Sequence, residues 1–188
     1  MNWYTINNTF LSYLRDIEKR IPYTNYGVGK LKPFFGSLFE VGDLVYLTQV
    51  SHPKTKHNAM KENIDFLKLF DGQKLIAVVN LNYIFPVHKS KLIHVEYKNI
   101  GNFVSFANDY LKGNYITLLK REMKEIHLKD IASQALSLYK FKYEFPNNMV
   151  SKRCFDFKLL EEKCLEYIEQ EEIQAIADII DLVAYKKD

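Results

Sequence analysis

The sequence IDFLKLFDGQKLIAVVNLN, residues 64–82, contains two apolar stretches separated by Asp71-Gly72. Because a tight turn of this composition between apolar stretches is typical of a β-hairpin, we expect antiparallel strands over Ile64–Phe70 and Lys74–Asn82. The second strand carries the unbroken apolar run Leu75–Val79, which favours a central position in a sheet. This hairpin therefore predicts that a sheet forms the core of the protein.

Further strands are predicted on both sides of this hairpin. Aromatic and β-branched residues flank Gly42-Asp43 and predict a second hairpin, formed by Phe34–Val41 and Leu44–Val50. Short strands are also expected over Trp3–Ile6, Tyr83–Val87 and Leu92–Tyr97. The first hundred residues thus predict about six largely antiparallel strands in one main sheet.

From Asn102 onward the hydrophobic period changes to about 3.6 residues, which indicates helices. Their apolar stripes are expected to lie in the core. The expected helices are a short one that ends at Gly113-Asn114, then Ile116–Ile126, Ile131–Tyr139, Phe157–Ile168 and Ile173–Val183, and near the N-terminus one that is capped by Asn8 or Thr9 and closed by Pro22.

Strands followed by helices predict the α+β class, with helices around an antiparallel sheet. A chain of 188 residues is long enough for one domain with a sizeable core. We therefore expect a single domain over residues 1–188, in which residues 171–188 form a C-terminal helical extension.

Charge is unevenly distributed along the chain. Residues 1–150 hold 20 lysines and arginines against 13 acidic residues, whereas residues 151–188 hold 6 against 10. A basic body suits a polyanion such as RNA, although ordinary solvated surface charge has the same appearance.

No apolar run approaches the ~20 residues of a membrane span. Cys154 and Cys164 are ten residues apart in one expected helix, so they cannot form a disulfide bond within it. A cytoplasmic protein with free cysteines is expected.

The stretch Ser51–His57, which reads SHPKTKH, carries the most reactive chemistry in the sequence. It contains two hydroxyls, two imidazoles and two ammonium groups, and no carboxylate occurs between Leu44 and Lys61. Such groups suit a loop that holds a phosphate and moves protons beside it. A solvated loop has the same composition, so the residues alone leave both interpretations open.

A nuclease built on this loop is expected to work without a metal or another cofactor, because the acidic residues of the first hundred positions do not cluster as a two-metal site requires. Such an enzyme needs a base, an acid and cations beside the phosphate. His52 or His57 can exchange protons near neutral pH, Lys54 and Lys56 can neutralise phosphate charge, and Ser51 can position the phosphate.

Other basic residues are candidate RNA contacts, although a basic helix face is often merely solvated. The candidate RNA-binding residues are Lys30, Lys56, His57, Lys61, Lys120, Arg121 and Lys124.

Four segments, taken in order, resemble the ToxN/AbiQ family, the endoribonuclease toxins of type III toxin-antitoxin and abortive-infection systems. They are Trp3–Ile6, Lys32–Gly36, Ser51–Lys54 followed by His57-Asn58, and Cys154–Lys163. The resemblance implies a compact, strongly twisted antiparallel sheet surrounded by helices, similar to the MazF and Kid toxins. It also implies metal-independent cleavage of cellular or phage RNA that leaves a 2′,3′-cyclic phosphate and a 5′-hydroxyl.

The resemblance further implies a partner, a repeat RNA antitoxin that the toxin cuts into units. Each unit folds as a pseudoknot and binds back over the active site, and an oligomeric assembly of toxin and RNA is left open. The alternative function is a noncatalytic RNA-binding module that grips backbone phosphates with the same loop.

The resemblance implies roles for five residues. The active-site hydroxyls of the family correspond to Ser51 and His52, its loop lysine to Lys54, its lysine before the strand to Lys32, and an upstream tyrosine to Tyr26. Because the second hydroxyl is replaced by an imidazole, either Ser51 or His52 is expected to handle the proton. A loop of different length leaves Tyr23 as an alternative to Tyr26.

Overall fold

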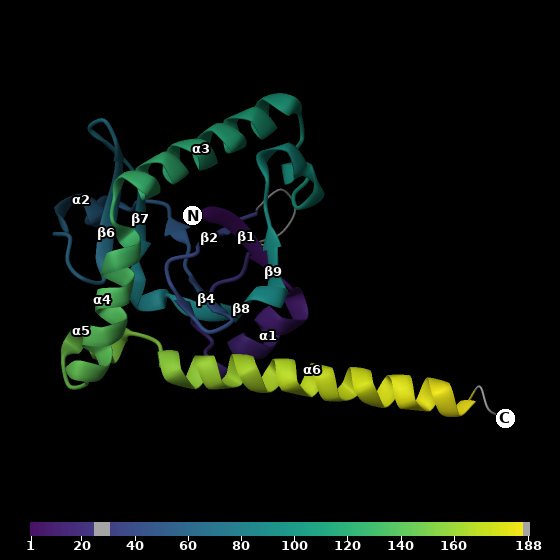
Figure 1. Cartoon of the computed structure of the whole chain (residues 1–188). Helices are drawn as coiled ribbons and strands as arrows, with labels where there is room; N and C mark the ends of the chain where they lie inside the picture. Colours follow the sequence, from purple (N-terminus) through teal and green to yellow (C-terminus); the bar gives the residue numbers. More distant parts are fainter. Residues whose placement is uncertain (25–30, 186–188) are drawn as a thin grey trace.

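In the computed structural model, residues 1–24 and 31–185 are described, and strands alternate with short turns before a helical second half (Figure 1). The strands are β1 Asn2–Ile6, β2 Phe34–Gly36, β3 Glu40–Val41, β4 Leu44–Leu47, β5 Val50–Ser51, β6 Phe66–Asp71, β7 Lys74–Asn80, β8 Phe85–His88 and β9 Leu92–His94. The α-helices are α1 Asn8–Ile17, α2 Thr55–Ala59, α3 Asp109–Leu128, α4 Ile131–Glu144, α5 Met149–Arg153 and α6 Phe157–Tyr185. Short 3-10 helices cover Leu81–Tyr83, Lys89–Lys91 and Tyr97–Asn102.

The hairpin around Asp71-Gly72 is confirmed. Strands β6 and β7 pair antiparallel from Phe66 opposite Asn80 to Asp71 opposite Lys74. Gly72 has a φ of 61°, a conformation that glycine adopts without steric cost and that such a tight turn requires. Strand β7 also lies between β5 and β6, as its apolar run predicts.

The α+β class with antiparallel pairing is confirmed, but the strands do not form one main sheet of about six. In the described part of the chain they form three three-stranded sheets, in the orders β2-β1-β9, β3-β4-β8 and β5-β7-β6. The expected hairpin over residues 34–50 does form around Gly42-Asp43, since β3 pairs with β4 and an antiparallel bridge joins Phe35 to Thr48. In addition, β2 pairs with β1, and β4 pairs with β8. Alternation of side chains identifies a strand but not all of its partners, so the division into three sheets is invisible in the sequence.

Helix α1 begins one residue earlier than expected and ends well before Pro22. The side chain of Asn7, not that of Asn8 or Thr9, accepts the hydrogen bond from the backbone N–H of Phe10 at 3.1 Å. The helix ends at Ile17. The apolar residues after it pack in the core without a further helical turn.

The second half contains fewer and longer helices than expected. Helix α3 runs through Gly113, where a helix end was predicted. A glycine inside a helix costs only about 1 kcal/mol relative to alanine, which a helix of this length tolerates. The two predicted C-terminal helices form the single helix α6, whose distal half projects from the body (Figure 1). Its stripe from Ile173 to Val183 was expected in the core, yet Ile173 and Ile180 are 60% and 61% exposed.

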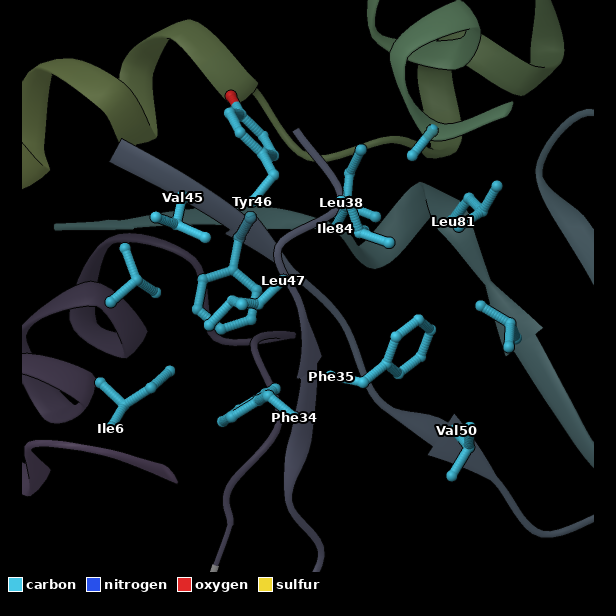
Figure 2. Close-up of a cluster of buried hydrophobic side chains, with 14 of the residues drawn as sticks. Ile6, Phe34, Phe35, Leu38, Val45, Tyr46, Leu47, Val50, Leu81 and Ile84 are labelled. Atoms are coloured by element: carbon cyan, nitrogen blue, oxygen red, sulfur yellow. The ribbon is translucent and has the colours of Figure 1, made fainter. Parts of the chain in front are cut away.

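The core lies between the sheets and the helices that cover them. Phe34, Phe35, Tyr46 and Leu47 are fully buried in one cluster (Figure 2). Within the described residues, no helix is both long and apolar enough to cross a membrane.

Candidate active site

Lys32 is held in place through the backbone on both sides of it. Its N–H donates to the carbonyl of Thr24 at 2.7 Å, and its own carbonyl accepts from the side-chain amide of Gln49 at 2.6 Å. The hydroxyl of Tyr115, from α3, donates to the carbonyl of Leu31 at 2.7 Å. These bonds fix Lys32 between the end of β4 and helix α3.

Ser51, the last residue of β5, and His52, which follows it, lie on two sides of Lys32. Val50 and Ser51 pair with Val79 and Val78 of β7, and successive side chains of an extended segment point in opposite directions. Ser51 and Lys32 line one pocket of about 200 Å³. His52 and Lys32 line a second pocket of about 300 Å³. The structure thus brings Lys32, Ser51 and His52 together, with Lys32 shared between two pockets.

The first pocket, which we call the Ser51 pocket, contains a cation that sequence reasoning missed. Arg20 lines it together with Asn80 and Tyr83. The guanidinium of Arg20 pairs with Glu18 at 2.6 Å. Arg20 follows α1, far in sequence from Ser51, and no local pattern signals that it reaches this pocket.

The second pocket, which we call the Glu122 pocket, contains a buried acid that sequence reasoning also missed. Glu122 is only 7% exposed, and no described residue donates a hydrogen bond to its carboxylate. Burial raises the pKa of Glu122 to about 7, and the attraction of Lys32 opposes this shift. Burial likewise lowers the pKa of Lys32, against the opposing effect of Glu122. An acid at a core position of the helical pattern was the one available signal.

His57 is part of the loop's internal structure. It is 8% exposed, its ring Nδ1 accepts a hydrogen bond from the backbone N–H of Lys54 at 3.0 Å, and the backbone N–H of His57 donates to the carbonyl of Lys54 at 2.8 Å. Burial and the nearby Lys56 and Lys54 lower the pKa of His57. A neutral imidazole that shapes the turn into α2 fits these contacts, which leave little of His57 available to RNA.

The remaining loop lysines are exposed and lie outside both pockets. Lys54, Lys56 and Lys61 face solvent, and none of them lines the Ser51 pocket or the Glu122 pocket. The predicted contacts Tyr26 and Lys30 lie outside the described residues.

The predicted basic residues of α3 do not converge on this site. At about 100° per residue, Lys120 and Lys124 lie on the opposite face of the helix from Glu122. Arg121 binds Asp71 at the turn between β6 and β7, with its Nε 2.6 Å from the carboxylate. Its charge is therefore already paired.

The fold matches solved structures over most of its length. It resembles AbiQ, a lactococcal anti-phage endoribonuclease belonging to the type III toxin-antitoxin system, with a TM-score of 0.66 at 20% identity, covering 89% of this chain and 98% of that one. A structure that concerns selective toxin inhibition by a non-coding RNA pseudoknot gives a TM-score of 0.69 at 22% identity, covering 90% of this chain and 99% of that one. One that concerns a processed non-coding RNA regulating a bacterial antiviral system gives 0.68 at 22% identity, with 88% and 98% covered. The fold is therefore that of these proteins.

Sequence relatives give the same result. The chain is 26% identical to endoribonuclease ToxN of Bacillus thuringiensis subsp. kurstaki over 179 residues, which cover 90% of this chain and 86% of that protein. It is 24% identical to endoribonuclease ToxN of Pectobacterium atrosepticum over 107 residues, 54% of this chain and 63% of that protein. The model of the family "Toxin ToxN, type III toxin-antitoxin system" matches residues 2–165. The chain belongs to this family, which confirms the resemblance carried by its four sequence segments.

Proposed function

We propose that this chain is a metal-independent endoribonuclease toxin that cuts RNA at the Ser51 pocket. The observation that carries the proposal is the meeting of Lys32 and Ser51, from separate segments, in one pocket. An ammonium and a hydroxyl there suit a phosphate. The names of the curated relatives, both endoribonucleases, support the same reaction class.

The proposed reaction needs no group beyond the RNA and these side chains. The ribose 2′-oxygen attacks the adjacent phosphorus, and the bond from phosphorus to the 5′-oxygen of the next nucleotide breaks. The 2′-hydroxyl loses one proton and the leaving 5′-oxygen gains one. The products are a 2′,3′-cyclic phosphate and a 5′-hydroxyl.

The side chains at the site have different proposed roles in the reaction. Lys32 offsets the charge of the phosphorane, and because burial lowers its pKa its ammonium releases a proton to the leaving oxygen more readily. Ser51 donates a hydrogen bond to the phosphate. His52, on the other side of Lys32, is the proposed proton carrier for the 2′-hydroxyl. Lys54 and Tyr26 complete the set that the family resemblance implies.

We also propose that the enzyme is inhibited by a repeat RNA that it cuts itself, each unit folding as a pseudoknot. Exposed Lys54, Lys56 and Lys61 lie in the segment between β5 and β6, and a folded RNA over the pocket can contact these cations. Solved relatives described with a processed non-coding RNA and with an inhibitory pseudoknot support this partner.

The test is cleavage of a long RNA in excess EDTA. Wild-type protein is expected to cut it into fragments whose 5′ ends accept a phosphate from polynucleotide kinase without prior dephosphorylation. Lys32→Met and Ser51→Ala are each expected to slow cutting by about a hundredfold or more, the range of a positioned proton donor or charge-stabilising hydrogen bond. Lys74→Met and Ser105→Ala, at exposed positions away from the pocket, serve as matched controls.

Loss of wild-type cleavage on chelation would contradict the metal-independent mechanism. If Ser51→Ala and Lys32→Met each kept full activity, the assignment of the active site to the Ser51 pocket would be wrong. Salt-dependent RNA binding without cleavage would instead support the noncatalytic RNA-binding module.

A further inference from the structure

We propose that the Glu122 pocket holds the nucleobase next to the scissile phosphate and uses the Glu122 carboxylate to reject uracil in favour of bases that carry an exocyclic amine. This inference rests on the proposed function and deepens it, because it assigns base selectivity to a residue outside the loop that carries the chemistry.

The pocket has the shape and lining that a flat base requires. Its volume of about 300 Å³ has apolar walls from Pro33, Val50 and Leu118. His52 and Tyr115 also line it, and single-stranded RNA is commonly bound with its bases stacked on such rings. Exposed His52 lies where a base enters from solvent.

Glu122 supplies the polar group of this apolar pocket. It lines the pocket and is 93% buried, since 7% of it is exposed. No donor reaches its carboxylate from residues 1–24 or 31–185. The N–H groups of a bound base can donate hydrogen bonds to this carboxylate, and a hydrogen bond to a charged group contributes more than one between neutral groups.

The position of the pocket matches the structure of a nucleotide. Base and phosphate are joined through one ribose, so their binding sites must be neighbours. The Glu122 pocket and the Ser51 pocket share Lys32. A phosphate held by Lys32 and Ser51 therefore leaves an attached base beside the Glu122 pocket.

The chemistry of the base edges sets the selectivity. Adenine, cytosine and guanine each carry an exocyclic amine that donates to a carboxylate, and guanine adds a second donor beside it. Uracil offers one N–H between two carbonyl oxygens, and these oxygens face the second oxygen of the carboxylate. A matched contact to a base edge discriminates by roughly tenfold or more.

The test is sequencing of the new 5′-hydroxyl ends made from a random-sequence RNA at pH 8, above the pKa of about 7 for Glu122. For wild-type protein we expect uracil to be depleted about tenfold at one position flanking the cut. Glu122→Gln is expected to remove this depletion at that position alone, because an amide donates to a uracil carbonyl while it accepts the N–H. Glu122→Ala is expected to remove it as well.

Glu125→Gln is the control, because it removes a carboxylate from the same helix outside the pocket. Circular dichroism establishes that each variant is folded. If wild-type protein cuts without uracil depletion, or if Glu122→Gln keeps the wild-type profile, the inference is wrong while the proposed function stands. If wild-type protein cuts no RNA, both fail.

Discussion

At the scale of single residues, the candidate site contains two opposite charges held partly out of water. Glu122 and Lys32 face one pocket but form no ion pair within 4.0 Å among the described residues. Burial therefore moves both pKa values toward neutrality, that of Glu122 up to about 7 and that of Lys32 down. Both side chains are thereby suited to exchanging a proton or a hydrogen bond with a ligand.

The raised pKa of Glu122 predicts a stability that depends on pH. The group titrates near 4.5 when unfolded and near 7 when folded, so it favours the folded state fully below pH 4.5, and this contribution is lost as pH rises to about 7. Glu122→Gln is expected to stabilise the protein by about 2 kcal/mol more at pH 8 than at pH 5, somewhat less than the full linkage value because Lys32 loses its partner. Urea unfolding of wild type and variant at both pH values measures this difference, and an equal effect at both would contradict the burial of an ionised carboxylate.

At the scale of elements, one carboxylate ties α6 to the sheets. Glu161 of α6 accepts hydrogen bonds from the hydroxyl of Tyr46, on β4, at 2.7 Å and from that of Tyr139, on α4, at 3.0 Å. The rings of Phe39 and Phe157 pack against the same tyrosines. The junction joins three elements, β4, α4 and α6.

Glu161→Ala is expected to destabilise the fold by roughly 2–4 kcal/mol, because it leaves two tyrosine hydroxyls without their acceptor. Tyr139→Phe removes one of the two bonds and is expected to cost about 1 kcal/mol. Chemical unfolding monitored by tryptophan fluorescence compares the two. If Glu161→Ala lowered the free energy of unfolding by less than Tyr139→Phe does, the role of Glu161 as the shared acceptor would be contradicted.

At the scale of the whole molecule, the part of the chain that matches the family ends before the projecting half of α6. The family model ends at residue 165, and the solved relatives are covered to 98–99% while they cover 88–90% of this chain. The distal half of α6 exposes Ile173, Ile176 and Ile180 at 58–61%. Tyr167 of α6 packs on Phe10 and Tyr13 of α1.

A chain that ends after Glu171 is therefore expected to keep the fold and the proposed cleavage activity. It retains the contact between Tyr167 and Phe10 and the ion pair between Lys91 and Glu171. Its melting temperature is expected to lie within about 4 °C of the full-length value, the effect of roughly 1 kcal/mol or less in a domain of this size. Thermal unfolding and RNA cleavage measure both. A drop of more than about 10 °C would show that residues 172–188 belong to the core of the domain.

Local features of the sequence were sufficient for the class of fold and for part of the site. Turn chemistry at Asp71-Gly72 and the run Leu75–Val79 predict the central hairpin, because backbone conformation and side-chain alternation act over a few neighbouring residues. The sequence alone also identified the loop from Ser51 to His57 and the four segments that resemble the family. The first seven residues of α6, Phe157–Lys163, belong to the longest of these segments.

Only the tertiary structure decided which residues share a pocket. The sequence could not assign Ser51 and His52 to different sides of Lys32, place Glu122 beside that lysine, or bring Arg20 to the site. It also placed the Ile173–Val183 stripe in the core, although nothing in the described structure covers it. Periodicity reports that a face is apolar, whereas burial, strand partners and pKa shifts depend on contacts between segments far apart in the chain.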